Sequence, residues 1–157
     1  MEIERKWKIA GFPTTLQPVT EAAVRQGYIA TRPVVRIREA VQAGSTQYIL
    51  CFKGEGTLVR EEIETPLDEA TFRKLERFIG KPLVTKEFKT YRLPGGELLE
   101  VSLVDKGLAT QFYYAEVEFP TVEAARAFVP PAGLGLLEEW TEDARFSMSG
   151  YWNETRK

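Results

Sequence analysis

The sequence contains no histidine and a single cysteine, Cys51. These absences exclude a Cys/His zinc site, a cysteine–histidine nucleophile pair and an intramolecular disulfide, which suits a reducing cytosol. Any general base must therefore be Lys, Tyr, Glu, Asp or a metal-bound water. No apolar run is long enough to span a bilayer, and a strand pattern that begins at Met1 leaves no place for a signal peptide. We expect a cytoplasmic protein that does not bind membranes.

The chain also lacks a basic excess. Its 21 Lys and Arg residues against 23 Asp and Glu residues give a net charge of −2, which argues against nucleic-acid binding. With 157 residues, 43% hydrophobic and 28% charged, it is long enough and apolar enough for one globular domain with its own core. We expect a single domain over residues 1–157 and leave the oligomeric state open, a homodimer included.

Alternating polar and apolar residues dominate the chain, and a period of two predicts β-strands. Eight strands are expected, over roughly 1–9, 23–30, 34–41, 48–53, 58–67, 82–93, 97–104 and 112–119. Helices are expected at 68–80, at 121–128 and in a C-terminal segment that Thr141 caps and that contains Asp143, Arg145 and Phe146. Because short turns join most strands, we expect a mainly β, α+β fold: a closed eight-stranded antiparallel barrel with a few flanking helices.

The first strand places Glu2, Glu4 and Lys6 on one face, opposite Ile3 and Trp7. Two carboxylates two residues apart along a strand are separated by about 6.6 Å and repel each other. A hard divalent cation such as Mg²⁺ or Mn²⁺ would relieve that repulsion, since oxygen ligands suit it. Taken alone, this segment favours the simpler interpretation of an exposed edge strand whose charges block further pairing.

Similar polar rows recur on the other strands. The basic residues are Lys6, Arg36, Arg38, Lys53, Arg60, Lys86 and Arg92, and the acidic residues are Glu2, Glu4, Glu62, Glu64, Glu100, Glu116 and Glu118. Half-buried sheets usually turn such rows to water. The abundance of arginine and the three Glu-x-Glu pairs favour the alternative, a barrel with its charges inside that binds a polyanion and divalent cations.

An ordered set of motifs covers nearly the whole chain. It comprises the ExExK segment Glu2–Lys6, Arg25–Tyr28, Arg36-Ile37-Arg38, Lys53 before a Gly-rich turn, Arg60 with Glu62 and Glu64, Lys86, Glu116-Val117-Glu118 and Thr141–Phe146. This set resembles the CYTH superfamily, the triphosphate tunnel metalloenzymes. That superfamily includes bacterial inorganic triphosphatases, thiamine triphosphatases and class IV adenylate cyclases.

The resemblance implies a polar tunnel and a metal-dependent triphosphatase that acts on inorganic triphosphate with Mg²⁺ or Mn²⁺. The implied metal ligands are Glu2, Glu4, Glu116 and Glu118, with Glu62, Glu64 and Glu100 as supporting carboxylates. The implied triphosphate-binding residues are Lys6, Arg36, Arg38, Lys53, Arg60, Lys86 and Arg145. Lys6 and Tyr28 would lie near the attacking water, and nearby positive charge would lower the pKa of Tyr28.

Three positions depart from the family pattern. Phe88 stands where relatives usually have arginine, Ser102 where they have an acid, and Ser147–Gly150 where they have lysine and asparagine. Phe88 would either stack on a base or thiazole ring or plug part of the tunnel. The alternatives are therefore thiamine triphosphate or ATP as substrate, class IV-type cyclase chemistry, a non-catalytic polyphosphate- or nucleotide-binding protein, and a plain structural barrel with a solvated charged face.

Overall fold

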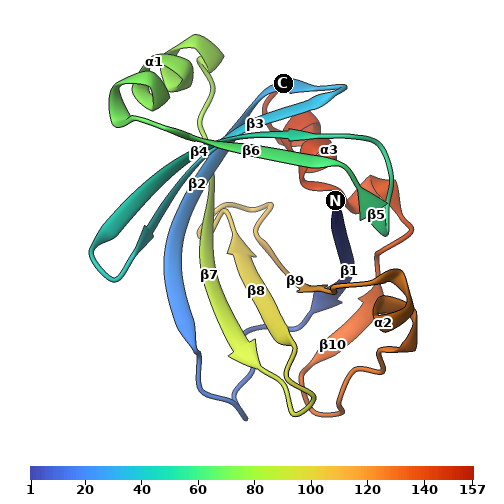
Figure 1. The fold of residues 1–157 in the computed structure, drawn as a ribbon. Coiled ribbons are helices and arrows are strands. Elements are labelled where there is room, and N and C mark those ends of the chain that lie inside the picture. Colours follow the sequence, from blue (N-terminus) through green and yellow to red (C-terminus); the bar gives the residue numbers. More distant parts are fainter.

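Ten β-strands form one antiparallel sheet that curls into a nearly closed barrel in the computed structural model, which describes residues 1–157 (Figure 1). The strands are β1 (Glu2–Ile9), β2 (Thr20–Thr31), β3 (Val34–Gln42), β4 (Ser45–Lys53), β5 (Val59–Arg60), β6 (Glu62–Leu67), β7 (Val84–Arg92), β8 (Leu98–Val104), β9 (Phe112–Glu118) and β10 (Leu136–Glu139). The helices are α1 (Glu69–Ile79), α2 (Val122–Ala127), the 3₁₀ turn η1 (Ala144–Phe146) and α3 (Met148–Thr155). None of these helices is long and apolar enough to cross a membrane.

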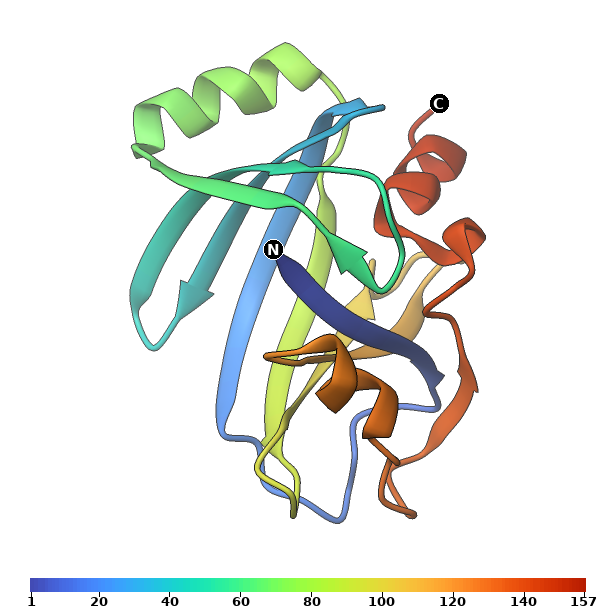
Figure 2. The ribbon, with the colours of Figure 1, turned by 45° about the vertical axis from the view of Figure 1, so that its right-hand side comes forward.

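The ring closes between the first strand and the short strand β5. The sheet order is β10-β1-β9-β8-β7-β2-β3-β4-β6, and β5 pairs with β1 through Glu2 opposite Arg60 and Ile3 opposite Val59. Only Glu61 separates β5 from β6, so these two pieces of one expected strand bridge β4 and β1 (Figure 2). The eight-membered ring expected from the sequence is therefore present, and β10 is an additional strand on the free part of β1.

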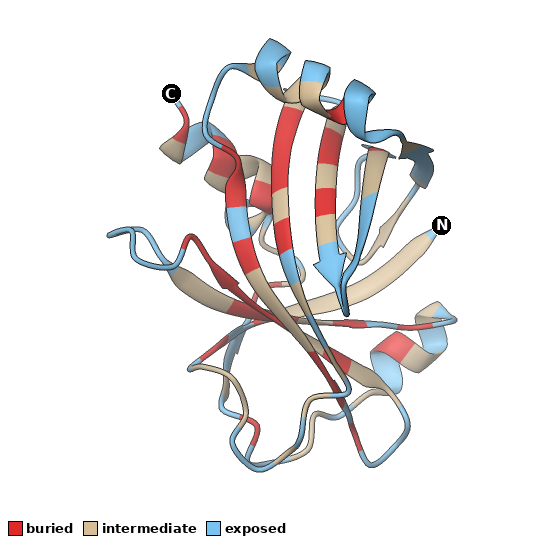
Figure 3. Ribbon diagram, turned by 90° about the vertical axis from the view of Figure 1, so that its left-hand side faces the viewer, coloured by how far each residue is buried: buried red, intermediate tan, exposed pale blue.

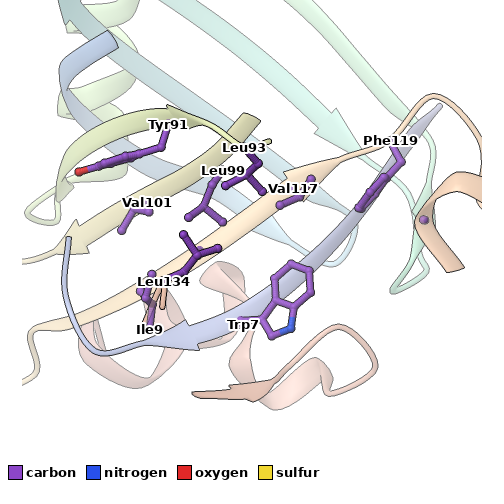
Figure 4. Close-up of a cluster of buried hydrophobic side chains, with 11 residues drawn as sticks. Trp7, Ile9, Tyr91, Leu93, Leu99, Val101, Val117, Phe119 and Leu134 are labelled. Carbon is purple, nitrogen blue, oxygen red and sulfur yellow. The ribbon is translucent and has the colours of Figure 1, made fainter. Parts of the chain in front are cut away.

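The apolar rows of the strands lie on the outer face of the barrel. Alternate residues of β8 and β9, such as Leu99, Val101 and Val117, belong to a buried cluster with Trp7 and Leu134 (Figure 4). The residues between them in sequence line the lumen. This decides between the two interpretations of the polar rows, because the charged residues face inward and the solvated charged face of a plain barrel is contradicted.

The helices cover parts of the apolar outer face. Asp68 accepts a hydrogen bond from the Thr71 amide at 2.6 Å and caps α1, and Gly80 ends that helix in the left-handed conformation, as expected. Phe72 of α1 is fully buried and packs on Tyr48. Figure 3 shows that most of the rest of this helix is exposed or intermediate. Phe78 of the same helix is 77% exposed and does not join the core.

The C-terminal segment differs from the expectation. Thr141 caps no helix: its hydroxyl accepts a hydrogen bond from the Lys6 amide at 2.9 Å and thereby ties the chain to β1. Asp143 caps the short η1 turn, and the last helix, α3, begins only at Met148 with Ser147 as its N-cap. The expected helix over Asp143–Phe146 was wrong in extent: the side chain of Asp143 accepts a hydrogen bond from the Arg145 amide and begins a 3₁₀ turn that ends at Phe146.

Candidate active site

A cavity of about 250 Å³ lies between the inward faces of the strands. Strands β1 to β9 and the start of α3 all contribute to its wall. It is lined by every residue that the family resemblance assigned to the site except Arg145: Glu2, Glu4, Lys6, Tyr28, Arg36, Arg38, Lys53, Arg60, Glu62, Glu64, Lys86, Glu100, Glu116 and Glu118. Arg92 of the polar rows also lies outside it, exposed at the end of β7, where it donates to the Gly96 carbonyl at 2.7 Å. The fold therefore brings residues from the whole length of the chain to one charged space.

Three carboxylates form the tightest acidic cluster of the cavity. Glu2, Glu4 and Glu118 each place an oxygen within 4.8 Å of the others. Glu118 joins the two glutamates of β1 because β9 pairs with β1 in a register that sets it opposite Glu4. Burial and the neighbouring Glu116 raise the pKa of Glu4, and burial together with Glu2 raises the pKa of Glu118. A hard divalent cation fits this oxygen-rich donor set and would neutralise the repulsion that raises these pKa values.

Glu116 of β9 lies opposite Glu100 of the neighbouring strand β8. Burial opposes the ionisation of Glu116, but Lys6 and Lys86 outweigh it and hold its pKa below the usual range. Burial and the charge of Glu116 raise the pKa of Glu100 to about 8. Glu116 is thus the ionised counter-charge to the lysines, whereas Glu100 is mostly protonated at neutral pH until a cation binds beside it.

Some cations of the cavity already have carboxylate partners. Lys53 lies 3.0 Å from Glu2 and 3.4 Å from Glu62, and Arg38 lies 3.7 Å from Glu64. Glu62 and Glu64 therefore orient basic residues, which is the supporting function that the sequence suggested for them. These pairs hold their side chains in place along the β3–β4–β6 wall.

Four other cations have no carboxylate partner, and one of them, Arg60, donates its Nε to the Gly54 carbonyl at 3.0 Å. Arg36 is 8% exposed, is in no ion pair, and buries its Nε without a hydrogen-bond partner. Lys86 is 9% exposed and donates only to the Tyr114 hydroxyl, at 2.5 Å. Lys6 is likewise in no ion pair, and its Nζ lies 5.7 Å from the centre of the Tyr114 ring. Glu116 is the one ionised carboxylate that acts on the two lysines, without forming an ion pair with either, and Arg36 has no carboxylate partner. Because buried positive charge that exceeds its counter-charge is costly, this arrangement is suited to an anion that arrives from outside.

The lysine–tyrosine contact of the tunnel differs from the implied one. No hydrogen bond joins Lys6 to Tyr28; the Tyr28 hydroxyl instead accepts from the Gln26 amide at 3.2 Å. Burial raises the pKa of Tyr28, although Arg36 and Lys53 act in the opposite direction, so these cations alone do not lower it. The role of Lys6 and Tyr28 near the attacking water stays a prediction.

Burial has a large effect on the lysine that contacts Tyr114. It lowers the pKa of Lys86 to about 7, even though Glu116 favours the charged form. Tyr114 was not assigned to the site from the sequence. It stands two residues before Glu116 on the same strand face, so the period of two that selects Glu116 and Glu118 would also have selected it.

Arg145 is the one predicted phosphate ligand that the structure does not bring to the cavity. Its side chain is 82% exposed and pairs with Asp143 at 2.6 Å. The cause is local, because a carboxylate two residues away captures the guanidinium group at the surface.

Phe88 and Ser102, the two uncharged residues at positions where the family usually has charged ones, are direct neighbours. Phe88 lies opposite Ser102 across β7 and β8, and Ser102 lies opposite Tyr114 across β8 and β9. All three line the cavity. The missing arginine and the missing acid would therefore have faced each other, so their joint absence leaves the charge balance of the tunnel unchanged.

A second cavity, of about 450 Å³, adjoins the tunnel beside α3. It shares Glu4, Lys6, Lys53 and Arg60 with the tunnel and is otherwise lined largely by loop residues, among them the Gly-rich turn 54–57. Polyanions longer than the tunnel would therefore extend into a wide and mostly polar space.

Comparison with known proteins places the chain in a family. It is 37% identical over 145 residues to an inorganic triphosphatase of Nitrosomonas europaea, with 92% of each protein covered. The chain belongs to the CYTH superfamily of triphosphate tunnel metalloenzymes. No model of a protein family matches the sequence.

Several solved structures have the same fold as this chain. The crystal structure of the inorganic triphosphatase NE1496 superimposes with a TM-score of 0.63 at 31% identity, covering 96% of this chain and 93% of that one. The PH1819 protein of Pyrococcus horikoshii superimposes with a TM-score of 0.68 at 18% identity over 99% of this chain and 100% of that one. A putative adenylyl cyclase from Hippeastrum, described as having a dominant triphosphatase activity, gives 0.51 at 17% identity, covering 80% and 83% of the two chains. At these lower identities the likeness shows the fold alone.

Proposed function

We propose that this protein is a divalent-metal-dependent phosphohydrolase that cleaves a phosphoanhydride bond of inorganic triphosphate. The observation that carries the proposal is the separation of charge inside one cavity. Lys6, Arg36 and Lys86 lack carboxylate partners, while three glutamates crowd within 4.8 Å of one another nearby. A triphosphate with a bound divalent cation satisfies both groups at once. The similarity to an inorganic triphosphatase supports this substrate.

Different residues of the cavity would bind the metal and the phosphate groups, the two functions that phosphoryl transfer requires. Glu2, Glu4 and Glu118 would hold Mg²⁺ or Mn²⁺, with Glu116 and Glu100 beside them. A bound metal ion would neutralise part of the negative charge of the phosphate groups. Lys6, Arg36 and Lys86 would bind the phosphate oxygens, and Arg38, Lys53 and Arg60 would complete the positive wall. Such a site works mainly by positioning and charge neutralisation, which needs no covalent intermediate.

The test is phosphate release from inorganic triphosphate, with and without Mg²⁺ or Mn²⁺. We expect metal-dependent release by the wild type and at least a hundredfold loss in Glu4→Gln, because the variant keeps the shape of the side chain and removes one metal ligand. Glu138→Gln is the matched control, since Glu138 is an exposed glutamate of β10 outside the cavity. Equal rates in the Glu4→Gln variant and the wild type would refute the assignment of the metal site. Thiamine triphosphate and ATP, assayed in parallel, rank the organic alternatives.

A second candidate is a protein that binds polyphosphate or nucleotide without hydrolysing it. The uncharged pair of Phe88 and Ser102 favours it, because the tunnel lacks a cation and an acid at these facing positions. It predicts that triphosphate raises the melting temperature while no phosphate is released. The double variant Phe88→Arg, Ser102→Asp would then gain turnover, whereas a wild type that already hydrolyses triphosphate excludes this candidate.

A further inference from the structure

The first turn of α3 forms part of the tunnel wall. Ser147, Met148 and Ser149 line the cavity together with Arg36, and the two serines also line the adjoining cavity. Figure 1 shows α3 at the same end of the barrel as β5, the strand that closes the ring. A helix that begins at this place turns its N-terminal amide groups toward the charged space.

Two of these amide groups have no acceptor within α3. The Ser147 hydroxyl accepts from the Gly150 amide at 3.0 Å, and the Ser147 carbonyl accepts from the Tyr151 amide at 3.0 Å. The amide N–H groups of Met148 and Ser149 belong to the first turn, which has no partners inside the helix, and no side chain or loop carbonyl accepts from them. Free N–H groups and the positive end of the helix dipole together favour an anion at such a position.

Arg36 independently indicates an anion in the same space. Its side chain projects into the cavity from β3, is 8% exposed, and has an Nε without a partner. No carboxylate lies within ion-pair distance of it, in contrast to Lys53 in the same cavity. A buried guanidinium group without a carboxylate partner and two amides at a helix N-terminus therefore present donors to the same cavity.

We propose that the N-terminus of α3 is a phosphate subsite, at which the Met148 and Ser149 amides donate hydrogen bonds to a substrate phosphate that Arg36 also binds. This inference rests on the proposed function, because it assigns a further binding element to the same tunnel. It gives Ser147–Gly150 a function through its backbone, although this segment lacks the lysine and asparagine that relatives usually carry there. The alternative is that Ser147 simply caps a packing helix.

The sharpest test compares Met148→Pro with Met148→Ala. Both variants lose a side chain that is 8% exposed, but only proline also removes the amide N–H. Proline is well tolerated at the first helical position, and the extended backbone of Ser147 (φ −74°, ψ 152°) suits a residue before proline. We expect the KM for triphosphate to be about tenfold higher in the proline variant than in the alanine variant, the effect of one lost hydrogen bond to a charged group.

A second pair keeps the inference testable if the Met148 variants fail to fold. Ser149→Asp and Ser149→Asn have side chains of the same shape and differ in charge. An acid in the first turn stabilises a helix, so a merely structural role predicts an equal or higher melting temperature and an unchanged KM for the Asp variant. The subsite predicts that the Asp variant melts no lower than the Asn variant and yet binds triphosphate about tenfold more weakly, because its carboxylate repels the phosphate.

The outcomes separate the two proposals. A wild type that neither hydrolyses inorganic triphosphate nor is stabilised by it overturns both the function and the subsite. A wild type that hydrolyses triphosphate, with equal KM values within each pair of variants, overturns the subsite and leaves the function standing.

Discussion

Replacing Glu4 with Gln tests whether the acidic cluster is a metal site. The carboxylate oxygens of Glu2, Glu4 and Glu118 lie within 4.8 Å of one another. At this distance each ionised pair repels by about 3 kcal/mol for an effective dielectric constant of about 20. The raised pKa of Glu4 means that its neutral form prevails at pH 7 without metal. Glutamine imitates that form, so we expect the metal-free melting temperature to change by no more than about 2 °C.

The effect of Glu4→Gln on the melting temperature should appear when metal is added. At a metal concentration about 100 times the dissociation constant, binding stabilises the wild type by about 2.7 kcal/mol. For a chain of this length that corresponds to a rise of about 5–10 °C in melting temperature. Glu4→Gln should lose most of this rise, measured by differential scanning fluorimetry with Mg²⁺ or Mn²⁺, and Glu138→Gln should keep it. A full metal-induced rise in Glu4→Gln would refute the reasoning.

The same cluster predicts a pH dependence of opposite sign with and without metal. Burial and the neighbouring Glu116 hold the folded pKa of Glu4 above the ordinary glutamate value of 4.5. The folded protein therefore binds more protons than the unfolded chain between these two pKa values, and this group's contribution to stability falls as pH rises through that window. Metal binding requires the ionised carboxylate, so the metal-induced rise should instead grow with pH. Glu4→Gln should show a weaker fall in stability without metal, because only the raised pKa values of Glu2, Glu100 and Glu118 then contribute to it, and should lose most of the metal-induced rise at every pH.

Two further predictions concern the lysine beside Tyr114 and the anchor of α3. Because the pKa of Lys86 is about 7, this side chain loses its charge just above neutral pH, whereas arginine in its place would keep its charge. Between pH 6.5 and pH 8.5 the affinity for triphosphate, measured calorimetrically, should therefore fall about tenfold more in the wild type than in Lys86→Arg. Equal pH dependence in both would contradict a role for this charge. Arg156 forms a 2.6 Å ion pair with Asp105, and the two side chains are only 6% and 2% exposed. Arg156→Met leaves the Asp105 carboxylate buried without its partner, so the free energy of unfolding, measured in urea, should fall by about 3–5 kcal/mol. A loss below about 1 kcal/mol would show that the pair does not anchor α3.

Local sequence patterns were sufficient for most of the barrel and for membership of the site. Alternation with a period of two placed Glu2, Glu4 and Lys6 on one face, and the same period placed Glu116 and Glu118 together. The cap at Asp68 and the glycine at its other end predicted α1. These features are set by residues within a few positions of each other, so they can be recognised without knowledge of the fold.

The details that only the tertiary structure decided depend on partners distant in sequence. The register of β9 against β1 put Glu118, and not Glu116, into the tight cluster with Glu2 and Glu4. The four-residue strand β10 is too short to have a recognisable alternation and exists because β1 offers it a free edge.

The contacts of single charged groups were decided in the same way. Tyr114 meets Lys86, and Arg145 turns to Asp143 at the surface. The start of α3 reaches the tunnel because Arg156 anchors that helix to the barrel. The alternation of a strand specifies which side chains share a face; the closure of the ring, which joins residues many positions apart, determines which of them meet.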